Sequence, residues 1–245
     1  MSFPLPDFTL LELLLCFGII AFAAILQVSV GMGFGMLASP LIALVKPELV
    51  PGSILAMGLV VAFSGAWRER ENIHPTELKL GVSGRVIGSM AALVILSSIT
   101  ELDSFLLVFG LLMLTAVAIT ASGIKVDFTN KNLLGLSVVS GLVGTITAVG
   151  APPMAIIYHN RPPSIVRPTL NAFFFSSSVL GIGILSVSGW LSTDDLVAAV
   201  IFLPAMWFGI WLSSPFKRIP QKILSVLLLS LSGLASLSLV LKAII

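Results

Sequence analysis

The sequence predicts an all-α polytopic membrane protein, on the strength of its composition and of its long apolar runs. Of the 245 residues, 57% are hydrophobic and only 10% are charged, with a mean hydropathy of +1.12. A soluble domain usually carries about a quarter charged residues. A soluble chain of this length must also cover itself in polar side chains, so one core cannot absorb this much apolar surface. The chain therefore needs a lipid bilayer around it.

The same composition excludes several classes of partner. The net charge of +2 comes from 13 Lys and Arg against 11 Asp and Glu, which gives no basic stripe for a nucleic acid. Cys16 is the only cysteine, so neither an intrachain disulfide nor a thiolate metal cluster is expected. Residues 1–7 lack the basic region of a secretory signal, so the first apolar run is expected to be a retained helix. No metal or other cofactor is predicted.

Ten segments are expected, at about 20 residues for each full crossing. Seven apolar runs are each long enough to cross a bilayer: 8–30, 80–98, 103–122, 132–149, 169–190, 196–213 and 223–244. The stretch 31–66 is interrupted by glycines and prolines, and is predicted to form a short broken segment (31–46) and a helix (52–66). The stretch 150–158 is too short to cross alone.

The distribution of basic residues predicts the orientation. If the N-terminus is external, ten basic residues fall on the cytoplasmic side: Arg68, Arg70, Lys79, Lys125, Lys131, Arg161, Arg167, Lys217, Arg218 and Lys222. Only Lys46 and Lys242 then fall outside, while Arg85 lies within a helix. The positive-inside rule therefore predicts a multi-pass protein of the cell inner membrane with both termini external.

The order of features repeats in the two halves of the chain. A glycine-rich stretch ending in proline occurs at 31–40 and again at 144–153, and each is followed by a short apolar segment. A proline then opens a helix in each half, Pro51 in the first and Pro168 in the second. Further on, the acidic helix start at 76–78 is matched by the one at 193–196.

Five segments in each half make the halves face opposite ways. The sequence thus predicts two inverted repeats, 1–124 and 125–245, which together form one transport domain. Inverted repeats are typical of secondary transporters, whose substrate site lies near the midplane where irregular segments of both halves meet.

The glycine-rich stretches are expected to face an internal cavity. Irregular backbone inside a membrane leaves N–H and C=O groups that only protein or trapped water can hydrogen-bond. Ser39 is predicted to be an N-cap with Pro40 as the first helical residue, and Pro152 and Pro153 are predicted to do the same in the second half. Two converging helix N-termini would form an anion site without a full charge. The alternative is that the glycines only permit close helix packing.

Several side chains are candidates for the same site. Arg85 is an intramembrane arginine, which indicates function, although its side chain can also extend to the interface. Asn171, predicted to open the helix after Pro168, Ser53, at the equivalent place after Pro51, Gln27 and the run 176–178 can donate hydrogen bonds to an oxyanion or join helices. The predicted substrate-binding residues are Gly33, Gly35, Ser39, Pro40, Ser53, Arg85, Thr147, Gly150, Pro153 and Asn171.

Glu12 is the candidate for coupling transport to a proton or sodium ion, because it is the only carboxylate well inside a segment. Its alternative role is that of an interfacial residue. His74 and His159 are expected in cytoplasmic loops beside basic residues, where contact with solvent or lipid headgroups is the default role.

The motif Gly31-Met-Gly-Phe-Gly-Met-Leu-Ala-Ser-Pro40-Leu-Ile and its partner Gly150-Ala-Pro-Pro153-Met-Ala resemble those of the TauE/SafE family of membrane permeases, also called the sulfite exporter family. The resemblance covers nearly the whole chain, although the second motif has fewer glycines than the family's pattern. It implies transport of sulfite, sulfoacetate or another organosulfonate, usually as export.

The leading hypothesis is therefore a secondary carrier of a small sulfur-containing anion. The sequence has no Gly-x-x-x-x-Gly-Lys-Ser/Thr motif for direct drive by ATP. One alternative is a membrane scaffold or assembly subunit without a substrate. Another is an intramembrane serine hydrolase, which needs a base beside its nucleophile, whereas both histidines are predicted in loops. A homodimer is compatible with the sequence, which marks no interface.

Overall fold

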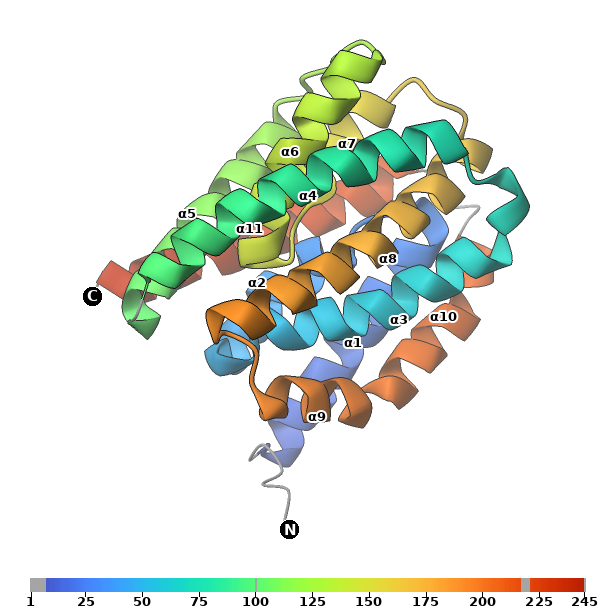
Figure 1. The fold of residues 1–245 in the computed structure, drawn as a ribbon. Coiled ribbons are helices and arrows are strands. Elements are labelled where there is room, and N and C mark those ends of the chain that lie inside the picture. The colour runs from blue at the N-terminus through green and yellow to red at the C-terminus, as the bar shows by residue number, and fades with distance from the viewer. Residues whose placement is uncertain (1–7, 100, 217–220, 245) are drawn as a thin grey trace.

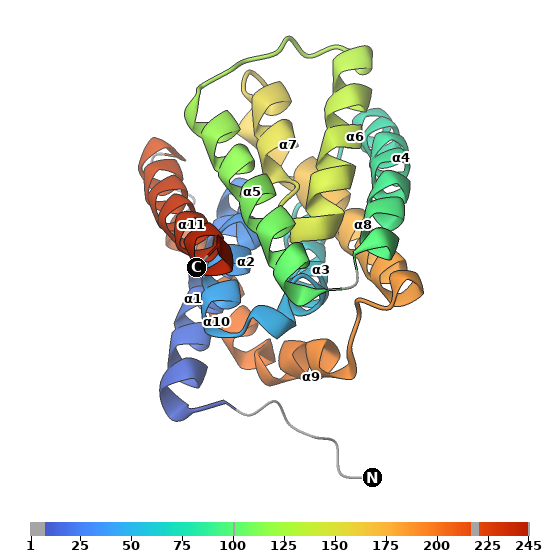
Figure 2. The same cartoon turned by 90° about the vertical axis from the view of Figure 1, so that its left-hand side faces the viewer.

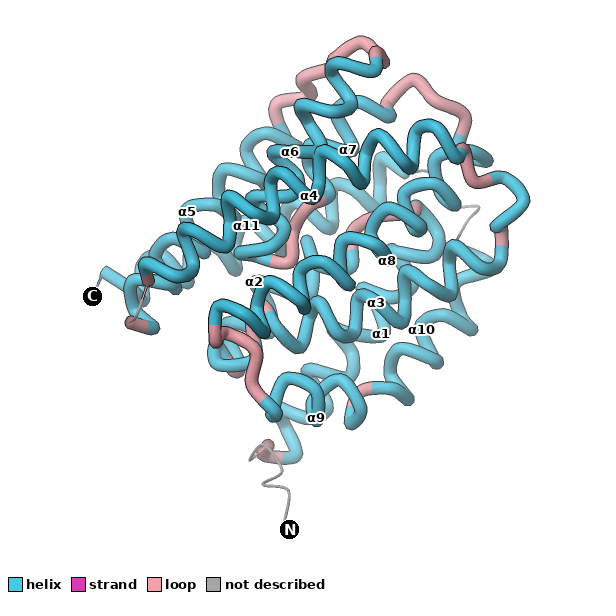
Figure 3. The backbone as a smooth tube through the Cα atoms, viewed as in Figure 1, coloured by secondary structure: helices cyan, strands magenta, loops and turns pink. Residues whose placement is uncertain are grey.

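The computed structural model describes residues 8–99, 101–216 and 221–244, and this part of the chain consists of helices and loops without a strand (Figures 1 and 3). The α-helices are α1 (Leu10–Val30), α2 (Phe34–Val45), α3 (Gly52–Arg68), α4 (Pro75–Ser98), α5 (Leu102–Ala121), α6 (Asn130–Thr147), α7 (Ala151–Tyr158), α8 (Pro163–Ser188), α9 (Thr193–Ile201), α10 (Leu203–Phe216) and α11 (Gln221–Ile244). Two short 3-10 helices, Pro47–Leu49 and Arg70–Asn72, flank α3. The all-α prediction is confirmed.

Among the described helices, four are long and apolar enough to cross a membrane: α1, α4, α8 and the part of α5 from Ser104 to Ala121. The pair α9 and α10 passes the same test together, but is bent by 48°. Large apolar side chains stand exposed on these helices, such as Val94 at 69% and Trp211 at 72%. A soluble protein rarely exposes so much apolar surface, whereas a bilayer covers it. The chain is a multi-pass membrane protein.

Three predicted boundaries are corrected by the structure. The helices α4 and α8 begin at Pro75 and Pro163, several residues before the apolar runs, because proline is well suited to the first turn of a helix. The run 196–213 was predicted as one crossing, but the helix breaks at Phe202. Pro204 follows that break and disfavours helical backbone before it, which explains the bend.

Two helical hairpins organise the interior. The hairpin α1–α2 turns at Gly31 and Gly33, whose φ angles of 91° and 120° favour glycine. Its two outer ends lie close together, since the ammonium of Lys46 lies 5.7 Å from the ring centre of Phe8. Pro51, at the N-cap of α3, opens the next helix as predicted.

The second hairpin, α6–α7, turns at Ala148, which adopts a left-handed φ of 60°. Its outer ends are also adjacent, since the rings of Phe128 and Tyr158 lie 5.2 Å apart. The two hairpins enter from opposite ends of the molecule (Figures 1 and 2). They meet inside it, where Ser39 Oγ donates a hydrogen bond of 2.5 Å to the carbonyl of Thr147.

The two ends of the molecule differ in charge. The connections α3–α4, α5–α6 and α7–α8 lie at one end, called here the basic end (Figures 1 and 2). It carries the following basic residues: Arg68, Arg70, Lys79, Lys125, Lys131, Arg161 and Arg167. The starts of α1, α5 and α9 lie at the opposite end. Lys46 lies there too, beside Phe8 at the start of α1. Lys217, Arg218, Lys222 and Lys242 fall outside the residues whose side chains are described.

Close packing of α4 on α6 positions Arg85. A Cβ atom added at Gly84 or Gly88 would collide with the carbonyl of Leu134 or Val138 on α6, so a larger residue at either position would separate the helices. Such small residues let helices approach closely inside membranes. The close approach places Arg85, which lies between the two glycines, directly against the turn of the α6–α7 hairpin.

Candidate functional site

A cavity of about 40 Å³ lies where the two hairpins meet. One water molecule needs roughly 10–15 Å³ on this measure, so the cavity has room for about three. Its wall is formed by both hairpins, by α3 and α8, and by one side chain of α4. The lining residues are Gln27, Gly33, Phe34, Gly35, Met36, Ile54, Leu55, Gly58, Ala62, Arg85, Ala148, Val149, Gly150, Ala151, Phe174, Ser177 and Ser178.

Arg85 supplies the one positively charged side chain on this wall. It is only 2% exposed, so its head is turned into the protein instead of extending to the interface. Its Nη1 donates hydrogen bonds to the carbonyl of Ser140 and, at 3.3 Å, to the hydroxyl of Ser140. The Nε atom is buried without a partner, and no carboxylate of the described chain forms an ion pair with this arginine.

Glycines make room for this guanidinium group. A Cβ atom at Gly150 would lie 2.7 Å from Arg85 Nη1, and one at Gly144 would lie 3.0 Å from Nη2. The hydroxyl of Ser140 donates a 2.7 Å hydrogen bond to the carbonyl of Gly150, which fixes the turn beside the arginine. The second glycine-containing motif is thus built around a buried positive charge.

The turn of the first hairpin is held by neutral amides. Gln27 Oε1 accepts a hydrogen bond from the N–H of Phe34 at 3.1 Å, and Gln27 Nε2 donates to the carbonyl of Gly31 at 3.1 Å. The same Nε2 donates to Asn171 Oδ1 at 3.0 Å, and Asn171 Nδ2 donates to the carbonyl of Arg167 at 2.9 Å. These bonds satisfy backbone N–H and C=O groups of the irregular turn, which find no water to bond inside a membrane.

The predicted start of the first broken helix is wrong. Helix α2 begins at Phe34 with Gly33 as its N-cap, so Ser39 and Pro40 lie inside the helix. Pro40 lacks the N–H that would bond the carbonyl of Met36, but the hydroxyl of Ser232 on α11 donates to that carbonyl at 2.6 Å. A hydrogen bond from a neighbouring helix therefore allows Pro40, which was predicted to start a helix, to lie inside one.

The second half follows the prediction more closely in α7 than in α8. Helix α7 starts at Ala151 with Gly150 as its N-cap and with Pro152 in its first turn. Pro168, however, lies inside α8, which begins at Pro163, so Asn171 is more than two turns into that helix. Asn171 contacts the turn of the first hairpin, not that of the second as expected.

The remaining predicted residues lie at different distances from the cavity. Gly33, Gly35 and Gly150 line it. Ser39 and Thr147 are buried where the two hairpins meet, and Pro40 and Pro153 are buried within their helices without lining the cavity. Ser53 lies at the start of α3, where its N–H donates to Asp195 Oδ1 at 2.8 Å and its hydroxyl donates to the carbonyl of Leu49. The binding roles of these residues remain predictions.

Glu12 lies in the first turn of α1. Its carboxylate accepts hydrogen bonds from the N–H and the hydroxyl of Thr9, at 2.8 and 2.9 Å, in a capping box. The structure therefore gives this carboxylate a helix-capping role near the opposite end, and its coupling role stays a prediction.

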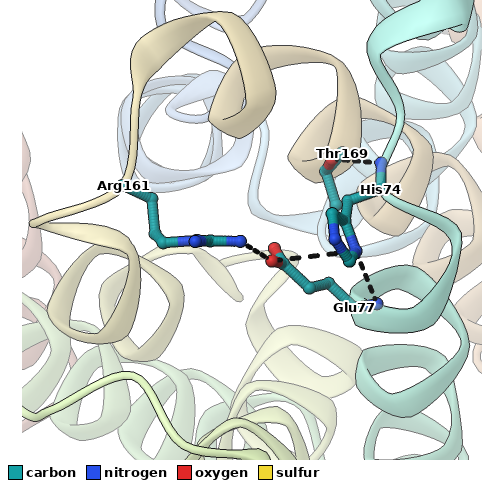
Figure 4. A network of polar contacts seen from close by, with 4 residues as sticks. All are labelled: His74, Glu77, Arg161 and Thr169. Atoms are coloured by element: carbon teal, nitrogen blue, oxygen red, sulfur yellow. Dashed lines mark hydrogen bonds and ion pairs between the residues drawn. The ribbon is translucent and has the colours of Figure 1, made fainter.

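A second polar cluster, which the sequence analysis missed, closes the basic end (Figure 4). Glu77 in the first turn of α4 is 5% exposed and pairs with Arg161 in the α7–α8 connection. His74 Nδ1 lies 3.7 Å from the same carboxylate, and the N–H of His74 donates to Thr169 Oγ1 at 3.0 Å. The cluster ties the start of α4 to the α7–α8 connection and to α8. His74 is therefore the N-cap of α4, more than a solvated loop residue.

Replacing Glu77 by glutamine is expected to lower the free energy of unfolding by about 2 kcal/mol, because it leaves Arg161 without its buried partner. Removing one member of a fully buried pair costs about 3–5 kcal/mol, and the partial exposure of Arg161 reduces this value. Thermal unfolding of Glu77→Gln, Arg161→Gln and the double variant checks the coupling, which should make the two losses less than additive. Glu48→Gln, at an exposed carboxylate, is the control. Strictly additive losses would show that the two residues act separately.

A family model described as "Sulfite exporter TauE/SafE" matches residues 16–239, which is nearly the whole chain. No curated protein and no solved structure matches the chain.

Proposed function

We propose that this chain, which belongs to the sulfite exporter TauE/SafE family, is a secondary transporter that exports a small sulfur-containing oxyanion across the inner membrane. The observation that carries the proposal is the environment of Arg85. A charged side chain buried without a counter-charge is strongly unfavourable, particularly inside a membrane. An anion in the adjoining cavity would supply that counter-charge.

The backbone around the cavity adds to the attraction. The first turns of α2 and α7 both face it, through Phe34, Gly35 and Met36 in the first hairpin and Ala151 in the second. Helix N-termini carry unpaired N–H groups and positive dipole ends, which favour an anion. Two prolines near the start of α7 remove N–H donors there. Arg85 lies beside the start of α7, so its guanidinium compensates for the N–H donors that are missing there.

The size of the cavity favours an inorganic oxyanion over an organosulfonate. Room for about three water molecules suits sulfite, whereas sulfoacetate and taurine also carry a carbon chain with a second charged group. The wall beyond the polar groups is apolar, through Ile54, Leu55 and Phe174, and offers no partner for such a group. We therefore place sulfite first among the substrates that the family suggests.

Helix packing supports the two inverted repeats, 1–124 and 125–245, and an alternating-access mechanism. Helix α1 of the first half packs on α10 of the second half, and correspondingly α6 of the second half packs on α4 of the first. The pairs α3 with α8 and α5 with α11 each join one helix from either half. The hairpins α1–α2 and α6–α7 then reach the same cavity from opposite ends, so movement of one hairpin at a time would open one side at a time.

The charge of the two ends supports an orientation with the basic end in the cytoplasm and the N-terminus outside. The positive-inside rule favours this arrangement. The Glu77–Arg161 pair would then close the cytoplasmic side of the second hairpin. Coupling to a proton or sodium ion through Glu12 is tested by Glu12→Gln, which should remove the dependence of transport on pH or on sodium.

The decisive test is the thermal stability of the purified protein in detergent against sulfite, thiosulfate, sulfate, sulfoacetate, taurine, acetate and chloride. A ligand that binds only the folded state stabilises it by about 2.7 kcal/mol at 100 times its Kd. We expect the largest rise with sulfite and smaller rises with sulfoacetate and taurine. Efflux of the same anion from proteoliposomes then checks transport. A folded protein that no anion stabilises would favour a scaffold subunit without a substrate.

A further inference from the structure

The cavity wall carries four polar side chains, and most of their hydrogen-bonding groups are already engaged. They are Gln27, Arg85, Ser177 and Ser178. The amide of Gln27 is fully used in holding the first hairpin turn. Ser177 donates a 2.7 Å hydrogen bond to the carbonyl of Phe173 in its own helix. Neither side chain has a donor left for a ligand.

Ser178 differs from its neighbours on α8. Ser176 and Ser177 each donate to the carbonyl four residues earlier, at 3.0 and 2.7 Å. Ser178 makes no such bond, and its hydroxyl has no hydrogen-bond partner within the described residues. The residue is only 5% exposed. Because Ser178 lines the cavity, its free hydroxyl can bond a molecule held there.

The position of this hydroxyl suits a ligand in the cavity. Its oxygen lies 3.5 Å from the point where a Cβ atom of Gly58 would stand, and the ring of Phe34 lies 3.6 Å from the same point. Gly58, Phe34 and Ser178 all line the cavity, so the Ser178 hydroxyl lies at the cavity edge between α3, α8 and the start of α2. Arg85 reaches the same cavity from α4.

We infer that Ser178 is a substrate-binding residue that donates a hydrogen bond to one oxygen of the transported oxyanion, while Arg85 binds the anion through its charge. This inference rests on the proposed function. An oxyanion has several acceptor oxygens, so it can be held by donors on different helices at once, and bonds to a charged acceptor are the strong ones. The other unengaged side-chain donors on the described wall are Nε and Nη2 of Arg85, so the charged and the neutral donors reach the cavity from different helices.

The test is the Kd for sulfite, measured by thermal-shift titration, in the wild type, Ser178→Ala and Ser176→Ala. We expect the Kd to rise about tenfold in Ser178→Ala. It should stay within about twofold in Ser176→Ala, whose hydroxyl is bonded to its own helix and which does not line the cavity. Without sulfite, Ser178→Ala should unfold at about the same temperature as the wild type, because the described structure loses no hydrogen bond with this hydroxyl.

Two results would overturn the assignment. One is an unchanged sulfite Kd in Ser178→Ala. The other is a clear loss of stability without sulfite, which would show that the hydroxyl has a structural role. If Arg85→Gln abolishes sulfite binding while Ser178→Ala leaves it intact, only the assignment of Ser178 fails. If the folded wild type binds no anion, the proposed function fails, and this inference fails with it.

Discussion

Replacing Arg85 by glutamine is expected to weaken sulfite binding by at least about 100-fold and to abolish transport. The substitution removes the one charge on the cavity wall while keeping a side chain that can donate to Ser140. Hydrogen bonds to charged groups contribute about 1.5–3 kcal/mol each, and about 2.7 kcal/mol corresponds to 100-fold in affinity. Thermal-shift titration gives the affinity, and sulfite efflux from proteoliposomes gives the transport rate.

The matched control is Arg70→Gln. Arg70 is exposed at the basic end, where its guanidinium lies 4.6 Å from the ring centre of Trp67, and it does not line the cavity. This variant should bind and transport sulfite like the wild type. Arg85→Lys should fall between the two, because lysine keeps the charge but loses the planar fork of donors. Wild-type sulfite affinity in Arg85→Gln would contradict the proposed anion site.

Replacing Gly35 by alanine is expected to lower the free energy of unfolding by about 3 kcal/mol and to stop transport. A Cβ atom at this position would collide with the carbonyl oxygen of Ala148, at the turn of the other hairpin. Backbone cannot move aside as a flexible side chain does, and overpacking of a tight contact costs about 1–3 kcal/mol or more. The hairpins would have to separate, which would displace both the wall of the cavity and Arg85.

Gly18→Ala is the control, because it makes the same chemical change in α1, where a Cβ atom would meet nothing within 4 Å. Alanine is the better helix former by up to about 1 kcal/mol, so this variant should be as stable as the wild type or more stable. Thermal unfolding and sulfite efflux measured on both variants separate the contact between the hairpins from a general intolerance of substitution. Equal stability of the two variants would refute the tight contact inferred at Gly35.

The prolines show where sequence reasoning succeeded and where it failed. Pro51 and Pro152 stand at or next to a helix start, as their fixed φ angle and missing N–H predict. Pro40 and Pro168 carry the same local signal but lie inside helices. For Pro40 the reason is visible in Ser232, which lies far away in the sequence and donates to the carbonyl that the proline leaves free. No local pattern contains that information.

The candidate site divides in the same way. Gly33, Gly35, Gly150 and Arg85 were predicted from the rarity of irregular backbone and of charge inside a membrane, and all four line the cavity. The roles assigned to Ser178 and Ser140 depend on tertiary contacts. The hydroxyl of Ser178 is left without a partner, whereas that of Ser140 bonds the carbonyl of Gly150. Asn171 was predicted beside the second hairpin but bonds to the first, because α8 begins earlier and crosses to α1.

By itself the sequence determined that the chain is a helical membrane protein, that the two glycine-rich stretches interrupt its helices, and how its basic residues are distributed. These properties follow from hydropathy, from glycine and proline, and from charge, all of which act along the chain. Only the tertiary structure decided that the two breaks lie against each other and that the head of Arg85 turns inward. It also decided that Glu77 pairs with Arg161. Such contacts join residues far apart in the sequence. They depend on how closely the helices approach one another, and no local sequence pattern encodes that distance.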